Sequence, residues 1–306
     1  MTDLTAIEKP RSLARDVWDQ FRTHKGALTG LVVLSTLFLF VVIGPFLWRI
    51  DPAFVEPDAA KMILSRNKPP TWAHPFGTDQ LGRDMLARLM TGGKVSLAVG
   101  AVAMVISMVI GTFVGVMAGF FRHLDGPLMR LTDLFLALPL LPLLLVMMML
   151  FGDTVRRMVG PEAGTFFLIV FAIGATSWMS AARVVRGQVL ALKEREFVLA
   201  ARSIGTSPGR MIMRHIIPNV VSSIMVAATL GIASAIITES VLSFLGLGFP
   251  PDFPTWGRLL FDGVQYIQLY PSRVMWPGLA ISLTVLSVNY IGDGLRDALD
   301  PRIRGR

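Results

Sequence analysis

Six long stretches without a charged side chain or a histidine constrain the fold of this chain more than any other feature. They cover residues 26–48, 95–121, 134–152, 163–182, 216–238 and 274–292. A helix rises about 1.5 Å per residue, so about 20 apolar residues are needed to cross the roughly 30 Å of hydrocarbon in a bilayer. Each stretch has about this length. The sequence therefore predicts an all-α membrane protein with six transmembrane helices.

The composition agrees with a lipid environment. Apolar residues make up 53% of the 306 residues and charged residues only 16%, against roughly 25% in an average soluble domain. The net charge of +8 would suit a nucleic-acid partner, but the basic residues lie mostly in short segments between the apolar stretches. We therefore expect contact with membrane lipid and none with nucleic acid. The chain has no cysteine and only four widely spaced histidines, so we expect no disulfide, metal site or bound cofactor.

The distribution of Lys and Arg predicts the orientation. With six spans both termini lie on one side, and the segments there hold 18 Lys and Arg, against 11 in the opposite loops. Positive residues accumulate inside the cell, so we expect both termini to be cytoplasmic. The first stretch is longer than the roughly 7 to 15 apolar residues of a signal peptide, which indicates an uncleaved span. We divide the chain into residues 1–75, with the tail, first span and outer loop, and a five-helix permease core at 76–306.

Small residues recur at every fourth position of the second stretch, at Ser107, Gly111, Gly115 and Gly119. Such a stripe lets two helix backbones approach closely, so we expect this helix to pack deep in the bundle. A stripe that lines a solute path is the alternative.

Proline and a few ionisable residues mark the ends of other stretches. Pro139 and Pro142 predict a kink in the third span, with either a structural role or a role in gating. Glu239 directly follows the fifth stretch and suits either an interfacial contact or the solute path. Arg130 and Asp133 are three residues apart and are expected to pair with each other.

Motifs of catalysis are missing from the sequence. It contains no G-x-x-x-x-G-K-[ST] phosphate loop, no H-E-x-x-H and no G-x-S-x-G. We therefore predict that the chain is not an enzyme and does not itself hydrolyse ATP. The uncharged stretches also lack the ionisable residues that secondary carriers use as ion relays. A carrier or channel stays open as the alternative to an ATP-driven transporter.

The loop at 192–219 predicts a short amphipathic helix outside the membrane, at about 194–205. Phe197, Ala200, Ala201 and Ile204 follow an i, i+3, i+4, i+7 pattern, which places them on one apolar face. Gly205 is suited to end this helix, and Ser207 with Pro208 to begin another. The pattern alone fits a helix docked in a partner's groove and a helix lying on lipid headgroups equally well.

This segment resembles the EAA loop of ABC importer permeases, in the form of the peptide and nickel subclass. The resemblance rests on Glu196, Phe197, Ala200, Ala201, Arg202 and Gly205, with Leu199 departing from the general motif, which has Glu there. In that family the helix docks in a cleft of the ATPase subunit and transmits its closure to the membrane helices. The resemblance therefore implies that these residues couple ATP hydrolysis to transport.

Three further segments resemble the "C"-type subunits of dipeptide and oligopeptide permeases. They are residues 76–84 before the second span, 243–257 between the last two spans, and 292–302 at the C-terminus. Residues 246–257 are rich in Gly and Pro and predict a non-helical outer loop. Asp79, Arg83, Asp84 and Arg88 suggest a salt-bridged helix before the second span. Asp293, Arg296, Asp297 and Asp300 suggest one polar helix face.

The resemblance implies a type I ABC importer permease fold in a bacterial cytoplasmic (inner) membrane. It also implies a homologous permease partner, two ATPase subunits that bind ATP and Mg, and a periplasmic or lipid-anchored solute-binding protein. Di- or oligopeptides are the implied solutes. Glutathione-like thiols, nickel chelates and modified peptides stay open.

Overall fold

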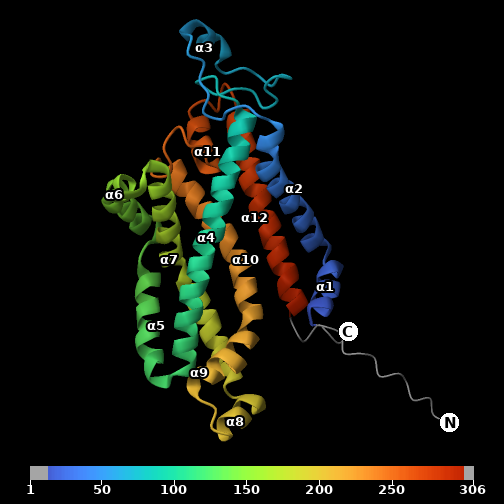
Figure 1. Ribbon diagram of the computed structural model, residues 1–306, viewed down its shortest axis with the longest axis vertical. Helices are drawn as coiled ribbons and strands as arrows, with labels where there is room; N and C mark the ends of the chain where they lie inside the picture. The colour runs from blue at the N-terminus through green and yellow to red at the C-terminus, as the bar shows by residue number, and fades with distance from the viewer. Residues whose placement is uncertain (1–12, 300–306) are drawn as a thin grey trace, which may run out of the picture.

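A computed structural model describes residues 13–299, and this part of the chain is built from helices (Figure 1). It contains no strand, only an isolated backbone bridge between Thr78 and Asp84. This confirms the predicted all-α class. The helices are α1 Leu13–Thr23, α2 Lys25–Leu47, α3 Ala59–Ser65, α4 Met85–Phe120, α5 Arg122–Ala137, α6 Leu140–Val159, α7 Pro161–Leu192, α8 Glu196–Ser203, α9 Pro208–Met211, a π-helical turn Ile212–Ile216, α10 Ile217–Phe244, α11 Trp256–Val264 and α12 Ser272–Leu299.

Five helical segments are long and apolar enough to cross a membrane, and α5 with α6 makes a sixth if this bent pair counts as one span. The five are α2, α4, α7, α12 and the continuous segment Pro208–Phe244. Several extend beyond the uncharged stretches of the sequence, because a charged residue with a partner does not end a helix. For example, α10 continues past Glu239 to Phe244. Glu239 therefore lies inside the span and does not end it.

The third predicted span is broken rather than kinked. Helices α5 and α6 meet at an angle of 84° across Leu138 and Pro139. Proline disfavours helical backbone in the residue before it, and Leu138 is extended, with φ −74° and ψ 132°. Pro142 lies in the first turn of α6, where a missing N–H costs no hydrogen bond. The two prolines thus end one helix and permit the next.

The stripe of small residues on α4 packs against α7, as predicted. A Cβ added to Gly111 would lie 2.7 Å from the carbonyl oxygen of Trp178, and one added to Gly115 would lie 2.6 Å from that of Ala182. Ser107 at the start of the stripe is fully buried. The two helices are in backbone contact, so the stripe serves packing in the core and does not face a solute path.

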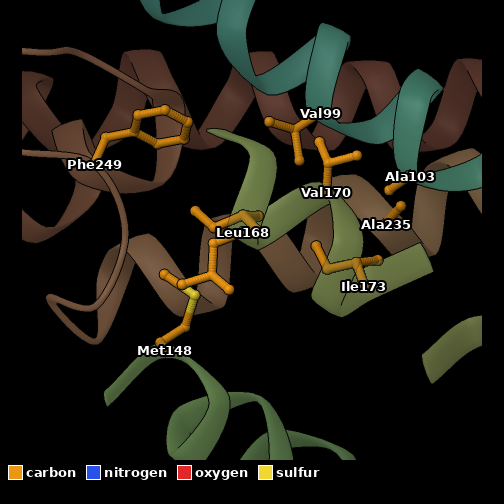
Figure 2. Packing of buried hydrophobic residues seen from close by; sticks show 9 residues of the cluster. Val99, Ala103, Met148, Leu168, Val170, Ile173, Ala235 and Phe249 are labelled. Atoms are coloured by element: carbon orange, nitrogen blue, oxygen red, sulfur yellow. The ribbon is translucent and has the colours of Figure 1, made fainter. Parts of the chain in front are cut away.

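The main apolar core lies beside this α4–α7 contact (Figure 2). Val99 and Ala103 from α4 meet Val170 and Ile173 from α7, with Ala235 of α10 alongside. Other large apolar side chains, such as Val109 and Phe113 of α4, are exposed on the outside of the bundle. An apolar exterior is what lipid-facing helices require, because lipid chains are as apolar as the side chains that they contact.

Helix α2 joins the rest of the bundle along α12. A Cβ on Gly30 would lie 2.7 Å from the carbonyl oxygen of Ser287, and one on Gly294 would lie 2.3 Å from the Cβ of Ala27. The first span is therefore packed tightly on the last. The proposed division between residues 1–75 and 76–306 stays a prediction.

The bundle has two different ends (Figure 1). One carries α3 and the loop at 66–84, and we call it the α3 end. The other carries α8 and α9, together with α1 and the last turns of α12, and we call it the α8 end.

Candidate functional site

Helix α8 and the turn after it have the capped geometry that the sequence predicts. Gly205 follows the helix with φ +79°, a conformation that side-chain-bearing residues rarely adopt. The amide of Thr206 donates to the oxygen of Ala201 at 3.1 Å, and the amide of Gly205 donates to that of Arg202 at 3.0 Å. These two bonds form a Schellman motif. Ser207 and Pro208 then begin α9, also as predicted.

The two sides of α8 are both apolar, which the sequence pattern did not show. Val198 and Ala201 are buried, Ala201 to 7% exposure, whereas Ile204 is 84% exposed. The predicted single face is therefore wrong for Ala201, which packs inward. Val198 was missed, although its spacing of three residues from Ala201 marks a second stripe. A helix lying on a bundle needs an inner apolar side as well as any docking side.

The inner side of α8 is part of a buried apolar cluster at the ends of the long helices. Val198 and Ala201 belong to a buried cluster with residues from α4, α7, α9, the π-helical turn and α10: Val116, Val185, Val189, Met211, Ile216 and Val220. The ring of Phe197 lies 6.5 Å from that of His215. The inner side of α8 therefore shares one buried cluster with three spans, α4, α7 and α10.

The outer side of α8 is an exposed apolar surface with a charged rim. Phe197, Leu199, Ile204 and Met213 are between 43% and 84% exposed. Ala200 shares this side, and Glu196 and Arg202 are exposed beside it. We call these seven residues the α8 surface.

A groove of about 970 Å³ runs along the bundle between α5, α6, α7 and α10 and reaches the end of α12. From Ser234 to Asn219 it follows α10 for 15 residues, or about 22 Å at 1.5 Å per residue. The size is at the upper end of the range for small-molecule sites. Leu136, Leu138 and Leu140 line it at the break between α5 and α6. Pro139 is part of this break but is not among the lining residues.

Neutral polar side chains from two helix faces line this groove. On α7 they are Thr176, Ser177, Ser180 and Gln188, and on α10 they are Asn219, Ser222, Ser223 and Ser234. Thr176 donates to the oxygen of Ala172 at 2.7 Å. The serine hydroxyls make no hydrogen bond with any residue between 13 and 299, so they are free to bind a molecule in the groove. Sequence reasoning missed them, although their i, i+3, i+4 spacing within apolar spans was a usable signal.

Glu239 lies outside this groove and is fully buried between α10, α4 and α11. Its Oε2 accepts from the Ser96 hydroxyl at 2.9 Å and its Oε1 from that of Ser243 at 2.8 Å. Ser96 in turn accepts from the amide of Trp256, the first residue of α11, at 3.2 Å. Glu239 thus joins three helices at the α3 end of the bundle.

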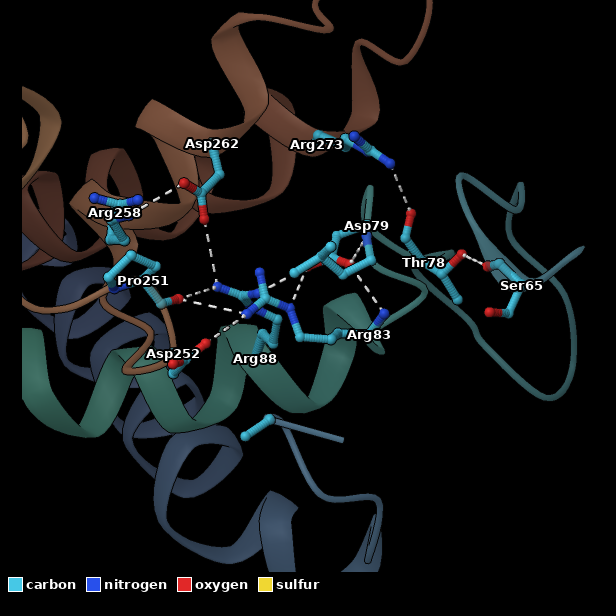
Figure 3. A network of polar contacts seen from close by, with 12 residues as sticks. Ser65, Thr78, Asp79, Arg83, Arg88, Pro251, Asp252, Arg258, Asp262 and Arg273 are labelled. Carbon is cyan, nitrogen blue, oxygen red and sulfur yellow. Dashed lines mark hydrogen bonds and ion pairs between the residues drawn. The ribbon is translucent and has the colours of Figure 1, made fainter. Parts of the chain in front are cut away.

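A buried polar network connects the loop at 66–84 to the bundle at the α3 end (Figure 3). Asp79 Oδ2 accepts from Arg83 Nε and from Arg88 Nη1, each at 2.7 Å. Arg88 also pairs with Asp262 at 3.4 Å, and Asp262 pairs with Arg258 at 3.1 Å. Burial raises the pKa of Asp262, although the neighbouring arginines act in the opposite direction. The network therefore joins the start of α4 to α11.

Two predicted arrangements need correction, and a third can be compared with the structure only in part. Residues 78–84 are not a salt-bridged helix: they form a loop, and Asp84 is the N-cap of α4, bonded to Trp48 and His74. Asp133 pairs with Arg183 of α7 at 2.6 Å instead of with Arg130, because α7 lies beside α5. In the polar face of α12, Asp293, Arg296 and Asp297 are exposed as expected. Asp300 lies outside the described residues.

The loop at 246–257 is largely non-helical, as predicted, and α11 begins near its end at Trp256. Within residues 13–299, no group of three or more His, Asp or Glu residues is arranged to hold a metal ion.

Comparison with known proteins identifies the family of this chain. Residues 107–305 match the family described as binding-protein-dependent transport system inner membrane component, and residues 12–70 match the N-terminal transmembrane domain of oligopeptide transport permease C. The oligopeptide transport system permease protein OppC of Bacillus subtilis is 37% identical, with 97% of this chain and 92% of that protein covered. The dipeptide transport system permease protein DppC of the same organism is 38% identical, with 98% and 89% covered.

Solved structures show the same fold. A chain of the methionine ABC transporter MetNI, in an inward-facing conformation, matches with a TM-score of 0.54 and 19% identity, covering 71% of this chain and 97% of that chain. A chain of an amino acid ABC transporter solved with histidines matches with a TM-score of 0.50 and 17% identity, covering 68% and 92%. With its apolar spans, its groove and this family match, the chain belongs to the binding-protein-dependent transport system inner membrane components, the multi-pass permease subunits of ABC transporters.

Proposed function

We propose that this chain is one of two permease subunits of an ATP-driven importer for peptides or chemically similar small solutes. The names of its relatives, oligopeptide and dipeptide transport permeases, support the solute class. The groove supports it too. Hydroxyl groups both donate and accept hydrogen bonds, so they can bind a peptide backbone whatever its side chains are.

The proposal includes three kinds of partner and an orientation. A second, homologous permease covers the open side of the groove. Two ATPase subunits, which carry ATP and Mg, bind at the α8 end, and a solute-binding protein delivers the solute at the α3 end. The α8 end and both termini then face the cytoplasm, in agreement with the excess of Lys and Arg on that side.

The observation that carries this proposal is the two-sided packing of α8. Its inner residues, Val198 and Ala201, belong to the core shared by α4, α7 and α10, and its outer residues leave an apolar surface uncovered. An uncovered apolar helix side next to charged residues suits insertion into a groove of another protein. Glu196, Phe197, Ala200, Arg202 and Ile204 would make this contact, whereas Ala201 and Gly205 would hold the helix in position.

Replacing Ile204 by Glu tests the contact. Ile204 is 84% exposed, so the chain should fold, but a carboxylate would have to be buried in the ATPase cleft. In proteoliposomes with the complete transporter, we expect ATP-driven uptake to fall at least tenfold. Ile204→Leu is the matched control, because it keeps an apolar side chain of the same size at this exposed position and should preserve uptake. Normal coupled uptake by the Ile204 variant would refute α8 docking.

A secondary carrier or channel is the competing function, and the buried carboxylate of Glu239 is the feature that favours it. Such a protein would lose uptake when the proton gradient is collapsed while ATP is kept constant. Our proposal expects uptake to continue under those conditions and to stop when ATP is withdrawn.

A further inference from the structure

The charge of the groove is concentrated in a single lining residue. Among the described residues that line the groove, Arg296 is the only charged one, and the others are apolar, hydroxyl-bearing or amide-bearing. It lies in the last turn of α12. Within residues 13–299 it forms no ion pair and no hydrogen bond, in contrast to Arg83, Arg88 and Arg258 at the α3 end, which are paired.

Two amide side chains lie at the same end of the groove as Arg296. Gln188 is near the end of α7, and Asn219 is near the start of α10. The Nδ2 of Asn219 donates to the oxygen of His215 at 2.7 Å, which fixes this side chain. Three polar side chains from three spans therefore line the α8 end of the groove.

The charges around Arg296 leave it available to an anion. Asp297 lies beside His24 of α2 at 3.9 Å and is not a lining residue of the groove. Asp293, one turn earlier on α12, is exposed and is also absent from the lining. Among residues 13–299, the guanidinium of Arg296 is thus the one charge that lines the groove at this end. Arginine binds carboxylates through two parallel N–H groups, and the amide groups beside it can supply further N–H donors.

We propose that Arg296, with Gln188 and Asn219, forms a binding site for the carboxylate of the transported solute at the α8 end of the groove. The site attracts solutes that carry a free carboxylate, such as the C-terminus of a peptide, and holds that end as the solute leaves the groove. The inference rests on the proposed function, since it takes the groove to be the solute path.

Charged thiol reagents can test the site, because the chain has no native cysteine. We would place the reporter cysteine at Ser222, one turn from Asn219, in the complete transporter. The measured quantity is the labelling rate with an anionic methanethiosulfonate divided by the rate with a cationic one. Two charges about 8 Å apart in water at physiological salt change such a ratio by about twofold. We expect Arg296→Gln to lower it by about this factor and Arg296→Lys to preserve it.

Two controls separate a local charge from a general effect. Ser234→Cys lies 12 residues further along α10, about 18 Å away, so its ratio should not respond to position 296. Arg15→Gln removes an exposed arginine from α1, outside the groove, and should leave the Ser222→Cys ratio unchanged. A ratio that ignores Arg296→Gln, or that responds equally to Arg15→Gln, overturns the proposal.

Protection by a peptide tests recognition of the carboxylate itself. Trialanine at millimolar concentration should slow the labelling of Ser222→Cys, trialaninamide should slow it less, and Arg296→Gln should remove the difference. Equal protection by the two peptides overturns the proposal. Loss of ATP hydrolysis in Arg296→Gln with unchanged ratio and protection would assign Arg296 to an ATPase contact and also overturns it.

The same reporter distinguishes a failure of this site from a failure of the proposed function. A bulky adduct on Ser222→Cys should block ATP-driven uptake if the groove is the path. Uptake that continues after complete labelling refutes the path and, with it, the binding of transported solute at Arg296. Blocked uptake together with an unchanged charge ratio refutes only the carboxylate site.

Discussion

Substitution of Gly115 by Ala tests whether the α4–α7 contact determines the stability of the bundle. An added Cβ would lie 2.6 Å from the carbonyl oxygen of Ala182 and 2.7 Å from the Cβ of Val185. Carbon atoms pack at about 3.5 to 4.0 Å, so the helices would have to separate by roughly 1 Å. Overpacking of this kind costs about 1 to 3 kcal/mol, while the higher helix propensity of Ala returns up to about 1 kcal/mol. We expect a net loss of about 1 to 2 kcal/mol.

Gly187→Ala is the matched control, because it makes the same change on α7, where nothing lies within 4 Å of the added Cβ. It should stabilise the protein by up to about 1 kcal/mol. Reversible unfolding of the purified chain in mixed micelles, followed by circular dichroism, measures both variants. Gly119→Ala should be milder than Gly115→Ala, since its nearest backbone atom is 3.1 Å away. Equal stabilities of the Gly115 and Gly187 variants would refute close backbone packing as the source of stability.

The remaining predictions concern the buried polar groups and the orientation. Glu239→Ala should destabilise the chain by about 2 to 4 kcal/mol in the same unfolding assay, because Ser96 and Ser243 lose their acceptor, whereas Glu239→Gln keeps an acceptor oxygen and should lose less. Arg88→Met should cost about 3 kcal/mol, since it removes one of the two arginines paired with the buried Asp79. Because the pKa of Asp262 is raised in the folded chain, the folded chain binds a proton there more readily than the unfolded chain. Between the ordinary and the raised pKa, the free energy of unfolding of the native protein, compared with that of Asp262→Asn, should therefore fall as the pH rises. When the chain is produced without the ATPase subunits, Ile204→Cys should react with a membrane-impermeant maleimide in inside-out vesicles and not in intact cells, and the opposite result would reverse the orientation.

The all-α class and five of the six spans could be predicted from the sequence because lipid imposes one simple requirement, a long apolar segment; the third predicted span is instead a bent pair of helices. The packing stripe of α4 could also be predicted, because small residues at every fourth position lie on one helix face and let a second helix approach closely there. Gly205 could be predicted because its role is local: a glycine after an amphipathic helix ends it. In each case the relevant information lies within a few helical turns of the chain.

Features that depend on a partner from a distant segment could not be predicted. Asp133 has Arg130 three residues away, yet it pairs with Arg183, because the packing of α5 on α7 decides which charge is near. Glu239 looked like a residue at the end of a span until Ser96 and the start of α11 were placed beside it. Ala201 was assigned to the outer side of α8, since sequence periodicity shows that a face is apolar but not which surface covers it.

The position of α8 connects the proposed ATPase contact with the groove. Its buried cluster contains Val185 and Val189 of α7 and Val220 of α10. The groove is lined by Val184 and Gln188 of α7 and by residues of α10 that begin at Asn219. Cluster and groove thus use neighbouring positions on the same helix turns, with α8 on one side and the groove on the other. A rotation of these turns that follows α8 would move Gln188 and Asn219 in the groove, so the inner end of the solute path is where ATPase closure should act first.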